Sequence, residues 1–423
     1  MITGLERIAQ NKLKYPESKH LNLIHYVNVE NLKGAYKRIN GKKATGTDKV
    51  SKDEYGKDLE AILNQLVVRM KTFSYRPQPT KRVYIPKAGS NKLRPLGIPS
   101  FEDKLVQNIM ADVLSEIYEP IFYDFSYGFR KDRDCHKAIK HLSEMIHRNK
   151  VNYIVDADIK GFFDNVDHKI LMEFLRKEIG DDVFLRYIIR FLKAGIMEHG
   201  KKIESDKNIP QGGLISPVLG NVYLYYALDM WFEIVVKKYC QGFCGIVRYA
   251  DDFVCCFEYK AEAQEFFVKL QERLAKFKLE IEVNKSKIIR FGRYAGEGKG
   301  TFDFLGFTFI SGTDRKGRYR TIKLTSKKKM SAKMKAANEW IHANMHMPVN
   351  ELIKKLNTKL IGHYRYYGIT GNYDKLEMFR WYVIERLKAW LHRRSQRAKM
   401  TWEKFDKIIE YNPIVKPKVY HSI

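Results

Sequence analysis

The stretch Tyr249-Ala250-Asp251-Asp252 joins two short apolar runs, residues 245–248 and 253–257. This pattern predicts a β-hairpin with two adjacent carboxylates at its turn. Like charges raise each other's pKa and Asp is depleted in strands, so the pair is a poor structural choice by itself. A divalent cation would offset the repulsion, because Mg²⁺ takes carboxylate and phosphate oxygens. Two such ions can clamp the attacking and leaving oxygens of a phosphoryl transfer, so the stretch predicts a nucleotidyl transferase.

The composition indicates a globular protein with a polyanionic partner. The chain has 423 residues, 44% of them hydrophobic, and a net charge of +28. The length suggests roughly two to four domains, and so large an excess of Lys and Arg favours nucleic acid over an acidic small molecule. Residues 313–423 contain 26 Lys and Arg against 9 Asp and Glu. This C-terminal quarter is therefore the strongest candidate for contact with a phosphate backbone.

Cysteine usage and hydropathy point to the cytoplasm. The five cysteines form neither a zinc-ribbon pattern nor an even disulfide framework, and reduced thiols are typical of cytosolic proteins. The N-terminus has no apolar signal core, and the most apolar stretch, residues 218–236, is interrupted by Asn221, Asp229 and Glu233. We therefore expect no membrane span.

The coarse pattern mixes helices and strands. Helical periodicity or composition predicts helices within residues 1–40, 54–71, 101–117, 169–178, 183–194, 214–236, 261–277 and 327–397. Strands are predicted at residues 82–86, 93–98, 153–158, 281–291 and 302–310. Residues 41–48 are expected to form a flexible basic loop, and the shift to a basic helical composition predicts a domain boundary near residues 312–325.

A third carboxylate follows a predicted buried strand. Asp158 ends the strand at residues 153–158 and would complete a three-carboxylate cage with Asp251 and Asp252. The ordinary alternative is a plain strand-end residue. Asp156 competes for the role, because strand alternation puts it on the same face as Asp158. Periodicity leaves that choice open.

A loop and a basic hairpin are candidates for nucleotide contact. Paired glycines in residues 209–217 would let the backbone approach a ligand closely, and Gln211 has an amide that can donate; a plain turn before a helix is the alternative. Lys87 and Arg94 lie on the hairpin formed by 82–86 and 93–98, where they could grip triphosphate oxygens or simply be solvated.

Two later stretches carry weaker signals. Lys285 and Lys287 could neutralise or protonate a leaving pyrophosphate, or form a solvated strand edge. Residues 362–368 interleave three tyrosines with a cation, as stacking surfaces for nucleic acid do, but at least two of the tyrosines are expected to be helix core. Three tryptophans are also expected in the core, namely Trp381, Trp390 and Trp402.

Taken in order, these motifs resemble one family closely, the bacterial group II intron reverse transcriptases, also called maturases. The matching blocks are residues 41–51, 93–107, 127–138, 158–164, 210–221, 249–252, 284–287 and 304–307. Eight ordered blocks form a far more specific signal than Tyr-Ala-Asp-Asp alone. Residues 362–420 also resemble the thumb and tail of short members of this family.

The resemblance implies an α+β right-hand polymerase with fingers, a palm built on an antiparallel sheet, and a helical thumb. Residues 1–150 would form an N-terminal extension and fingers. Residues 151–312 would form the palm, with about 165–215 partly in the fingers. The basic helical thumb would span 313–400 and a tail 401–423.

The implied activity is RNA-directed DNA polymerisation, the extension of a primer with dNTPs on an RNA template. The resemblance selects Asp158 over Asp156 as the first metal aspartate, because Phe163 falls where the family places the residue that guards the ribose 2′ position. The implied catalytic residues are Asp158, Asp251 and Asp252, and the implied metal site adds Ile159. The implied nucleotide-binding residues are Lys87, Arg94, Phe163, Gln211 and Lys285, with Lys287 left as an alternative to Lys285. The implied nucleic-acid contacts are Lys43, Arg130, Tyr249, Lys327, Lys328, Arg365, Arg393 and Arg394.

The resemblance also implies two Mg²⁺ ions, with Mn²⁺ as a substitute, and a bacterial cytoplasmic location. The expected partners are an RNA template and an RNA–DNA duplex, with group II intron RNA as the bound RNA, and dNTPs; a homodimer is left open. Many members carry an HNH endonuclease with paired cysteines, but no cysteine follows Cys256, so we expect a short form without that domain. The alternatives are a domesticated enzyme in phage defence or CRISPR systems, and a non-catalytic splicing factor that binds RNA.

Overall fold

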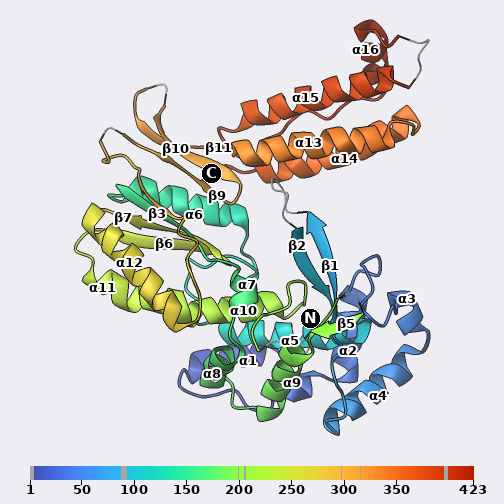
Figure 1. Cartoon of the computed structure of the whole chain (residues 1–423), viewed down its shortest axis with the longest axis vertical. Helices are drawn as coiled ribbons and strands as arrows, with labels where there is room; N and C mark the ends of the chain where they lie inside the picture. The colour runs from blue at the N-terminus through green and yellow to red at the C-terminus, as the bar shows by residue number, and fades with distance from the viewer. Residues whose placement is uncertain are drawn as a thin grey trace. The chain divides into compact units, whose positions relative to one another are not determined.

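The structure is a computed structural model that describes residues 4–86, 93–198, 200–203, 206–296, 298–314, 316–394 and 399–423. The chain divides into two compact units, both drawn in Figure 1. The first unit contains the described residues within Met1–Pro86, Lys92–Ala138 and Ile154–Ile288. The second contains those within Ile139–Tyr153 and Ile289–Ile423.

The central sheet of the first unit carries the predicted carboxylates. Its order is β6-β7-β3-β8, formed by β6 (Cys244–Tyr249), β7 (Asp252–Phe257), β3 (Tyr153–Asp158) and β8 (Lys287–Arg290). β6 and β7 are an antiparallel hairpin of mostly buried residues. The helix α12 (Lys260–Lys276) packs on β7, where the rings of Phe266 and Phe257 lie 5.0 Å apart. The predicted strand at 153–158 and the predicted hairpin are confirmed.

A second sheet has the order β2-β1-β4-β5. Its strands are β1 (Thr80–Pro86), β2 (Leu93–Ile98), β4 (Ile196–Glu198) and β5 (Lys201–Ile203). β1 and β2 form the predicted antiparallel hairpin, and β4 joins β1 in parallel through the pair Thr80 and Ile196. The short strands β4 and β5 were not predicted, because three residues are too few to show an alternating pattern.

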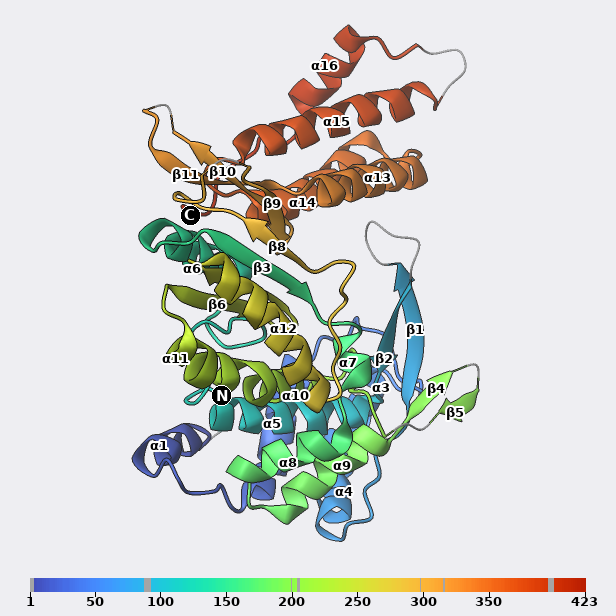
Figure 2. The same cartoon turned by 60° about the vertical axis from the view of Figure 1, so that its left-hand side comes forward.

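Besides α12, the first unit contains ten further α-helices within its described residues. They are α1 (Glu6–Lys14), α2 (Val29–Arg38), α3 (Lys52–Tyr55), α4 (Leu59–Lys71), α5 (Phe101–Tyr118), α7 (Phe162–Asn165), α8 (His168–Glu178), α9 (Asp182–Lys193), α10 (Ser216–Leu224) and α11 (Lys237–Tyr239). Side chains cap several of them as expected for helix starts: Ser100 accepts from the Asp103 amide at α5, and Asp181 accepts from the Phe184 amide at α9. In both views α5, α8 and α9 lie below β6 and β3 (Figures 1 and 2).

The second unit pairs a small sheet with long helices. Its sheet has the antiparallel order β11-β10-β9, formed by β9 (Thr301–Phe304), β10 (Phe307–Thr313) and β11 (Tyr319–Thr325). Its helices are α13 (Lys327–Asn344), α14 (Val349–Tyr367), α15 (Tyr373–His392) and α16 (Trp402–Tyr411). The end of the chain runs back along α14, where the Thr370 amide donates to the His421 carbonyl at 3.1 Å. The helix α6 (Cys135–Arg148) spans both units and was not predicted.

Three predicted elements differ from those in the structure. The single strand expected at 302–310 is two strands, because Leu305 and Gly306 have φ values of 49° and 83° and form a tight turn. Of the strand expected at 281–291, only Lys287–Arg290 forms a strand, β8. The helix expected at 214–236 begins as α10 and continues through two π-helical segments, Tyr225–Asp229 and Phe232–Val236.

The expected aromatic core of the C-terminal region is right in part. Tyr364 and Tyr367 are buried, as predicted for two of the three tyrosines in residues 362–368. The prediction for the tryptophans is wrong for Trp381 and Trp402, which are 55% and 47% exposed. Among the helices of the described residues, none combines the length and the apolar character needed to cross a bilayer.

Candidate active site

The hairpin turn places the two aspartates at the end of the β6–β7 ladder. Tyr249 pairs with Asp252, so Ala250 and Asp251 form the two-residue connection. Ala250 has a φ of 57°, a left-handed conformation that is uncommon for a residue with a side chain. Asp251 is half-buried and Asp252, the first residue of β7, is exposed. The turn therefore presents carboxylates at a sharp, constrained bend.

The third carboxylate ends the neighbouring strand. β3 lies beside β7 in the sheet, and its last residue is Asp158. The backbone here is fixed by a segment further along the chain: the Asp158 amide donates to Ser286 Oγ at 3.2 Å, and the Asp158 carbonyl accepts from the Glu282 amide at 2.8 Å. The side chain of Ile159 is buried and has no atom that binds a metal, so only its main-chain carbonyl could serve as a ligand.

The same segment brings a lysine to the site. Lys285 Nζ lies 3.1 Å from Asp158 Oδ2 and 3.8 Å from Glu282 Oε2. Lys287 is the exposed first residue of β8. Of the two lysines that the sequence left open, Lys285 is the one in contact with a predicted metal aspartate.

Electrostatics link the turn to its neighbours. Burial raises the pKa of Asp251, and the nearby negative charge of Asp158 raises it further. The positive charges of Arg94 and Arg248 act in the opposite direction on the same pKa. Asp158, Arg94 and Asp251 are thus close enough to interact, although they come from three separate parts of the sequence.

A buried ion pair supports the turn from behind, and the sequence analysis did not predict it. Arg248 and Asp229 are both fully buried, with Arg248 Nε 2.7 Å from Asp229 Oδ1. Arg248 Nη1 also donates to Asn221 Oδ1 at 3.0 Å and to the Ala250 carbonyl at 2.9 Å. Burial raises the pKa of Asp229, and the charge of Arg248 opposes that shift. The signal was present, since Asn221 and Asp229 interrupt an otherwise apolar stretch.

A loop packs directly against the turn. The Tyr127 amide donates to the Arg248 carbonyl at 2.8 Å, and a Cβ added to Gly128 would lie 2.3 Å from the Ala250 nitrogen. Glycine is required at this close approach of two backbones. The ring of Tyr249 lies 6.5 Å from that of Phe129.

Arg130 is engaged within its own loop. Its side chain is 3% exposed, forms an ion pair with Glu119 at 2.8 Å, and donates to the carbonyls of Tyr123 and Ser126. A guanidinium with these partners holds the loop in shape. The structure thus shows a role for Arg130 in holding this loop, and its contact with nucleic acid stays a prediction.

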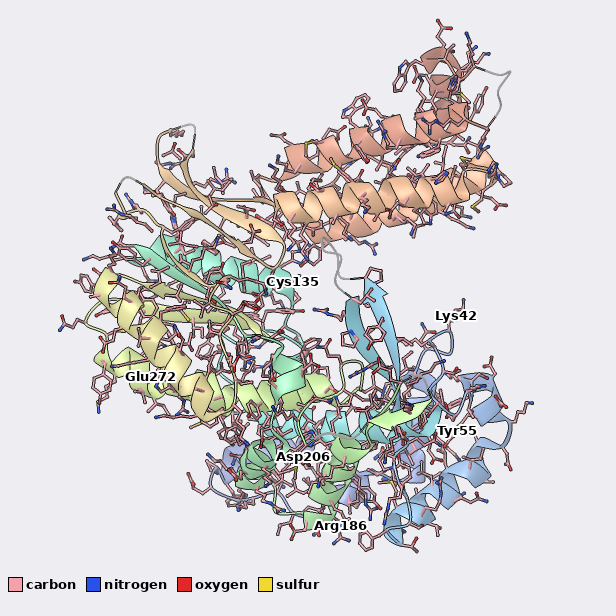
Figure 3. All side chains as sticks on the ribbon, in the orientation of Figure 1. Lys42, Tyr55, Cys135, Arg186, Asp206 and Glu272 are labelled. Carbon is pink, nitrogen blue, oxygen red and sulfur yellow. The ribbon has the colours of Figure 1, made fainter. Side chains whose placement is uncertain are left out.

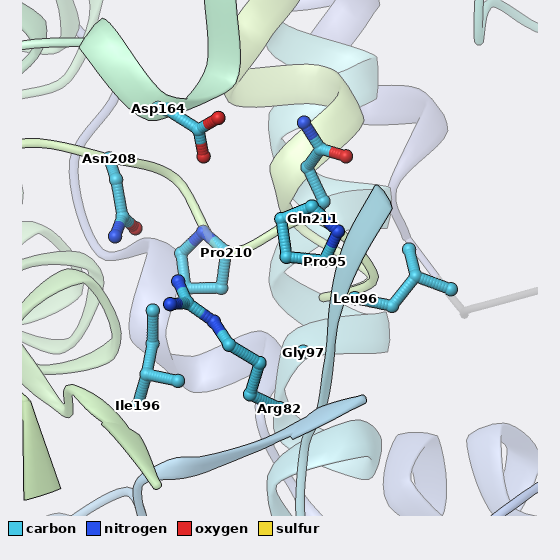
Figure 4. A pocket seen from close by; sticks show the side chains of 9 residues that line it. All are labelled: Arg82, Pro95, Leu96, Gly97, Asp164, Ile196, Asn208, Pro210 and Gln211. Atoms are coloured by element: carbon cyan, nitrogen blue, oxygen red, sulfur yellow. The ribbon is translucent and has the colours of Figure 1, made fainter. Parts of the chain in front are cut away.

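The glycine-rich loop approaches a strand. The Gly97 amide of β2 donates to the Gln211 carbonyl at 2.6 Å, and a Cβ on Gly212 would lie 2.5 Å from the Gly97 carbonyl oxygen. The loop thereby closes a small hollow, shown in Figure 4. Its lining residues are Arg82, Pro95, Leu96, Gly97, Asp164, Ile196, Asn208, Pro210 and Gln211. The structure therefore places Gln211 between the β1–β2 hairpin and α7.

Phe163 lies on the first helix after β3. Its ring and that of Phe162 are 5.0 Å apart, and a Cβ on Gly220 of α10 would meet the Phe163 ring at 3.0 Å. Phe163 is half-buried. One side of the Phe163 ring thus packs against Gly220 of α10, and part of the residue remains accessible to solvent.

The remaining predicted contacts are spread over both units. In the first unit Lys43 is exposed in the basic loop, and Figure 3 shows its neighbour Lys42 extending from the ribbon. In the second unit, Lys327, Lys328, Arg365 and Arg393 are exposed. Arg394 donates to the Met347 carbonyl at 2.6 Å. The prediction for Lys87 lies outside the described residues.

The donor chemistry of the site suits a hard divalent cation. Asp158 and Asp251 carry carboxylates whose charges interact, and carboxylate oxygens are the ligands that Mg²⁺ takes. Among the described residues, no three His, Cys, Asp or Glu side chains are gathered closely enough to hold a metal ion. One carboxylate oxygen of Asp158 faces Lys285 instead. The residues present fit a magnesium site by their chemistry, and a bound ion would have to bring their carboxylates closer together.

Comparison with known protein families agrees with this geometry. The family model for reverse transcriptase (RNA-dependent DNA polymerase) matches residues 85–309, more than half of the chain. The chain belongs to this family. The model for the group II intron maturase-specific domain matches residues 327–407 of the chain. The α+β right-hand polymerase fold expected from the sequence is that of the family.

Three relatives extend the comparison. The group II intron-encoded protein LtrA of Lactococcus lactis subsp. cremoris is 36% identical over 222 residues, 52% of this chain and 37% of LtrA. Protein YkfC of Escherichia coli strain K12 is 30% identical over 312 residues, 67% of this chain and 80% of YkfC. A 91 kDa protein in the cob intron of Schizosaccharomyces pombe is 34% identical over 178 residues, 42% of this chain and 22% of that protein. The matched region thus spans little more than a third of LtrA.

Proposed function

We propose that this chain is an RNA-directed DNA polymerase that extends a primer with dNTPs on an RNA template. The observation that carries the proposal is the site itself. A constrained turn bears Asp251 and Asp252 on the strand beside Asp158, and the charges of Asp158 and Arg94 both act on Asp251. Phosphoryl transfer depends mostly on positioning and on stabilising charge, and this arrangement supplies both.

The three aspartates would hold two Mg²⁺ ions, with the Ile159 carbonyl as a further ligand and Mn²⁺ as a substitute. Two bound ions supply Lewis-acid stabilisation of the attacking and leaving oxygens. The carboxylates must be ionised to bind them, and burial, which raises the pKa of Asp251, opposes the ionisation of that residue until an ion is bound. Lys285 stands beside Asp158, where its ammonium can neutralise or protonate a leaving pyrophosphate.

The nucleotide would be held by residues of the β1–β2 hairpin and its neighbours. Arg94 offers a planar guanidinium that can grip phosphate oxygens in a bidentate manner. The half-buried ring of Phe163, backed by Gly220, would exclude a 2′-hydroxyl and favour dNTPs over NTPs. Gln211 and Lys87 complete the proposed contacts with the nucleotide.

The test is primer extension on an RNA template with dNTPs and Mg²⁺. Wild type is expected to extend the primer, and Asp251→Asn to lose synthesis because a metal ligand is removed. The matched control is Asp303→Asn, an exposed aspartate of β9 outside the site, which should keep wild-type activity. Absence of synthesis by wild type on several templates would overturn the proposal.

A second proposed role is that of a maturase that binds group II intron RNA and assists its splicing. The match of residues 327–407 to the maturase-specific domain and the net charge of the C-terminal quarter support it. Exposed cations in that quarter include Lys327, Lys328, Arg365 and Arg393. Arg394 in the same region, and Lys43 and Tyr249 in the first unit, are further proposed contacts. Asp251→Asn should keep RNA binding and splicing while losing synthesis; loss of splicing with that single change would contradict two separable roles.

A further inference from the structure

The buried guanidinium of Arg248 has no direct part in the proposed chemistry. Arg248 lies in β6, and its partner Asp229 lies in the π-helical segment after α10. Neither residue is exposed to solvent. Removing two charges from water costs more than a well-packed apolar pair would. The arrangement therefore needs a reason beyond stability, and π-helical segments often occur at functional sites.

The hydrogen bonds of Arg248 give that reason. Nε donates to Asp229 Oδ1 at 2.7 Å, Nη2 also bonds to Asp229, and Nη1 donates to the Ala250 carbonyl at 2.9 Å. Ala250 immediately precedes Asp251 and has a positive φ. The guanidinium thus links the backbone of the constrained turn to the π-helical segment Tyr225–Asp229.

Asn221 adds a second link from α10. Its Oδ1 accepts from Arg248 Nη1 at 3.0 Å, and its Nδ2 donates to the Gly128 carbonyl at 2.7 Å. Gly128 is the residue that lies directly against Ala250. One amide side chain therefore holds both the cation beneath the turn and the loop that covers it.

The same turn of α10 reaches the nucleotide side of the site. Gly220, the neighbour of Asn221, lies against the ring of Phe163. A shift of α10 would move the support of Phe163 and the support of the Asp251 turn together. The network thereby couples two parts of the site that must be aligned for reaction.

We propose that Asp229, Arg248 and Asn221 are positioning residues that hold the Ala250-Asp251 turn in its metal-binding conformation. The proposal rests on the proposed function, because it assigns a metal to that turn. Errors of about 1 Å in the position of a reacting group can cost on the order of 10²-fold in rate. The hydrogen bonds of Arg248 to Asp229, Asn221 and the Ala250 carbonyl would limit such displacements of the turn.

The test compares Asn221→Ala with Tyr223→Phe in the full chain. Asn221→Ala removes two buried hydrogen bonds, those with Arg248 and Gly128. Tyr223→Phe removes one part-buried hydrogen bond of the same helix, which the Tyr223 hydroxyl donates to the Phe277 carbonyl and which involves neither the turn nor Arg248. Neither change leaves Arg248 or Asp229 without its ionic partner, so both variants should fold. Mn²⁺ affinity is titrated by electron paramagnetic resonance, with Asp251→Asn defining the binding event that depends on the turn. Primer-extension kcat and the KM for dNTP are measured in parallel.

We expect Asn221→Ala to weaken that Mn²⁺ binding about tenfold and to lower kcat by a similar factor, with the KM for dNTP little changed. Tyr223→Phe should match wild type in all three quantities. Equal Mn²⁺ affinity of the two variants, or a binding event that Asp251→Asn does not remove, would overturn the proposal. If wild type binds Mn²⁺ but makes no DNA, the proposed function fails while the Mn²⁺ comparison still decides the positioning role.

Discussion

Two ion pairs lie near the Asp251 turn and differ in almost every physical respect. Arg248 and Asp229 are both 0% exposed, and the guanidinium holds the carboxylate with two nitrogens. Lys285 and Asp158 are 61% and 49% exposed and meet through a single nitrogen at 3.1 Å. The first pair is built into the fold, whereas the second faces solvent.

The difference indicates separate roles. A buried pair cannot be exchanged for water or an ion without a large penalty, so Arg248 and Asp229 fix the geometry of the turn. An exposed pair contributes little to stability, so Asp158 can release Lys285 when a ligand competes for its carboxylate. The buried pair thus fixes the shape of the turn, and the exposed pair leaves the Asp158 carboxylate available to a ligand.

Breaking the buried pair should have the largest effect on stability. Asp229→Asn leaves the charge of Arg248 buried without an ionic partner, and we expect the free energy of unfolding to fall by about 3–5 kcal/mol. Urea denaturation measures the change. The matched control is Asp182→Asn, which breaks the exposed pair with Arg176 in the same unit and should change stability by less than about 1 kcal/mol. Similar losses in both variants would contradict the distinction.

A buried carboxyl hydrogen-bonded to neutral groups sharpens the comparison. Asp103 accepts hydrogen bonds from the Tyr75 hydroxyl and the Gln78 amide, and burial raises its pKa to about 6. Between pH 4 and 6 the unfolded chain has lost a proton that the folded chain still holds. Raising the pH through this window should therefore lower the free energy of unfolding, by about 3 kcal/mol from this group.

Asp103→Asn removes that titration, so its stability should depend less on pH over the same window. The measurement is urea denaturation of wild type and variant at several pH values between 4 and 6.5. An unchanged slope of stability against pH would show that Asp103 does not hold its proton in the fold.

The exposed pair should show the smallest effect on stability. Lys285→Ala is expected to change the free energy of unfolding by less than about 1 kcal/mol. Its primer-extension rate should nevertheless fall, by roughly 10²-fold if Lys285 acts as a general acid. Lys287→Ala is the control, with wild-type rate and stability. If Lys287→Ala loses more rate than Lys285→Ala, the two lysines have been assigned the wrong way round.

Local patterns predicted the parts of the site that depend on short-range order. The hairpin at Asp251, the strand that ends at Asp158 and the hairpin that carries Arg94 all follow from alternation and turn residues, and the structure has them. The choice of Asp158 over Asp156 came from resemblance alone, because both residues share a strand face.

What the sequence did not predict depends on contacts between distant residues. Arg130 is a cation, the kind of residue that contacts nucleic acid, and no sequence pattern indicates its ion pair with Glu119, which only the folded loop shows. The partners of Arg248 lie 19 and 27 positions away, beyond the range of any periodic pattern. The Leu305-Gly306 turn was missed because Leu is an unusual residue at positive φ.

The most direct test of the central claim is the rate at which one dNTP is added opposite a defined RNA base in a single turnover. Wild type should add the complementary dNTP in a Mg²⁺-dependent reaction, and Asp251→Asn should reduce that rate by at least about 10³-fold, as expected when charge stabilisation is lost. Addition that ignores the template base, or equal rates for both proteins, would contradict an RNA-directed polymerase site at this turn.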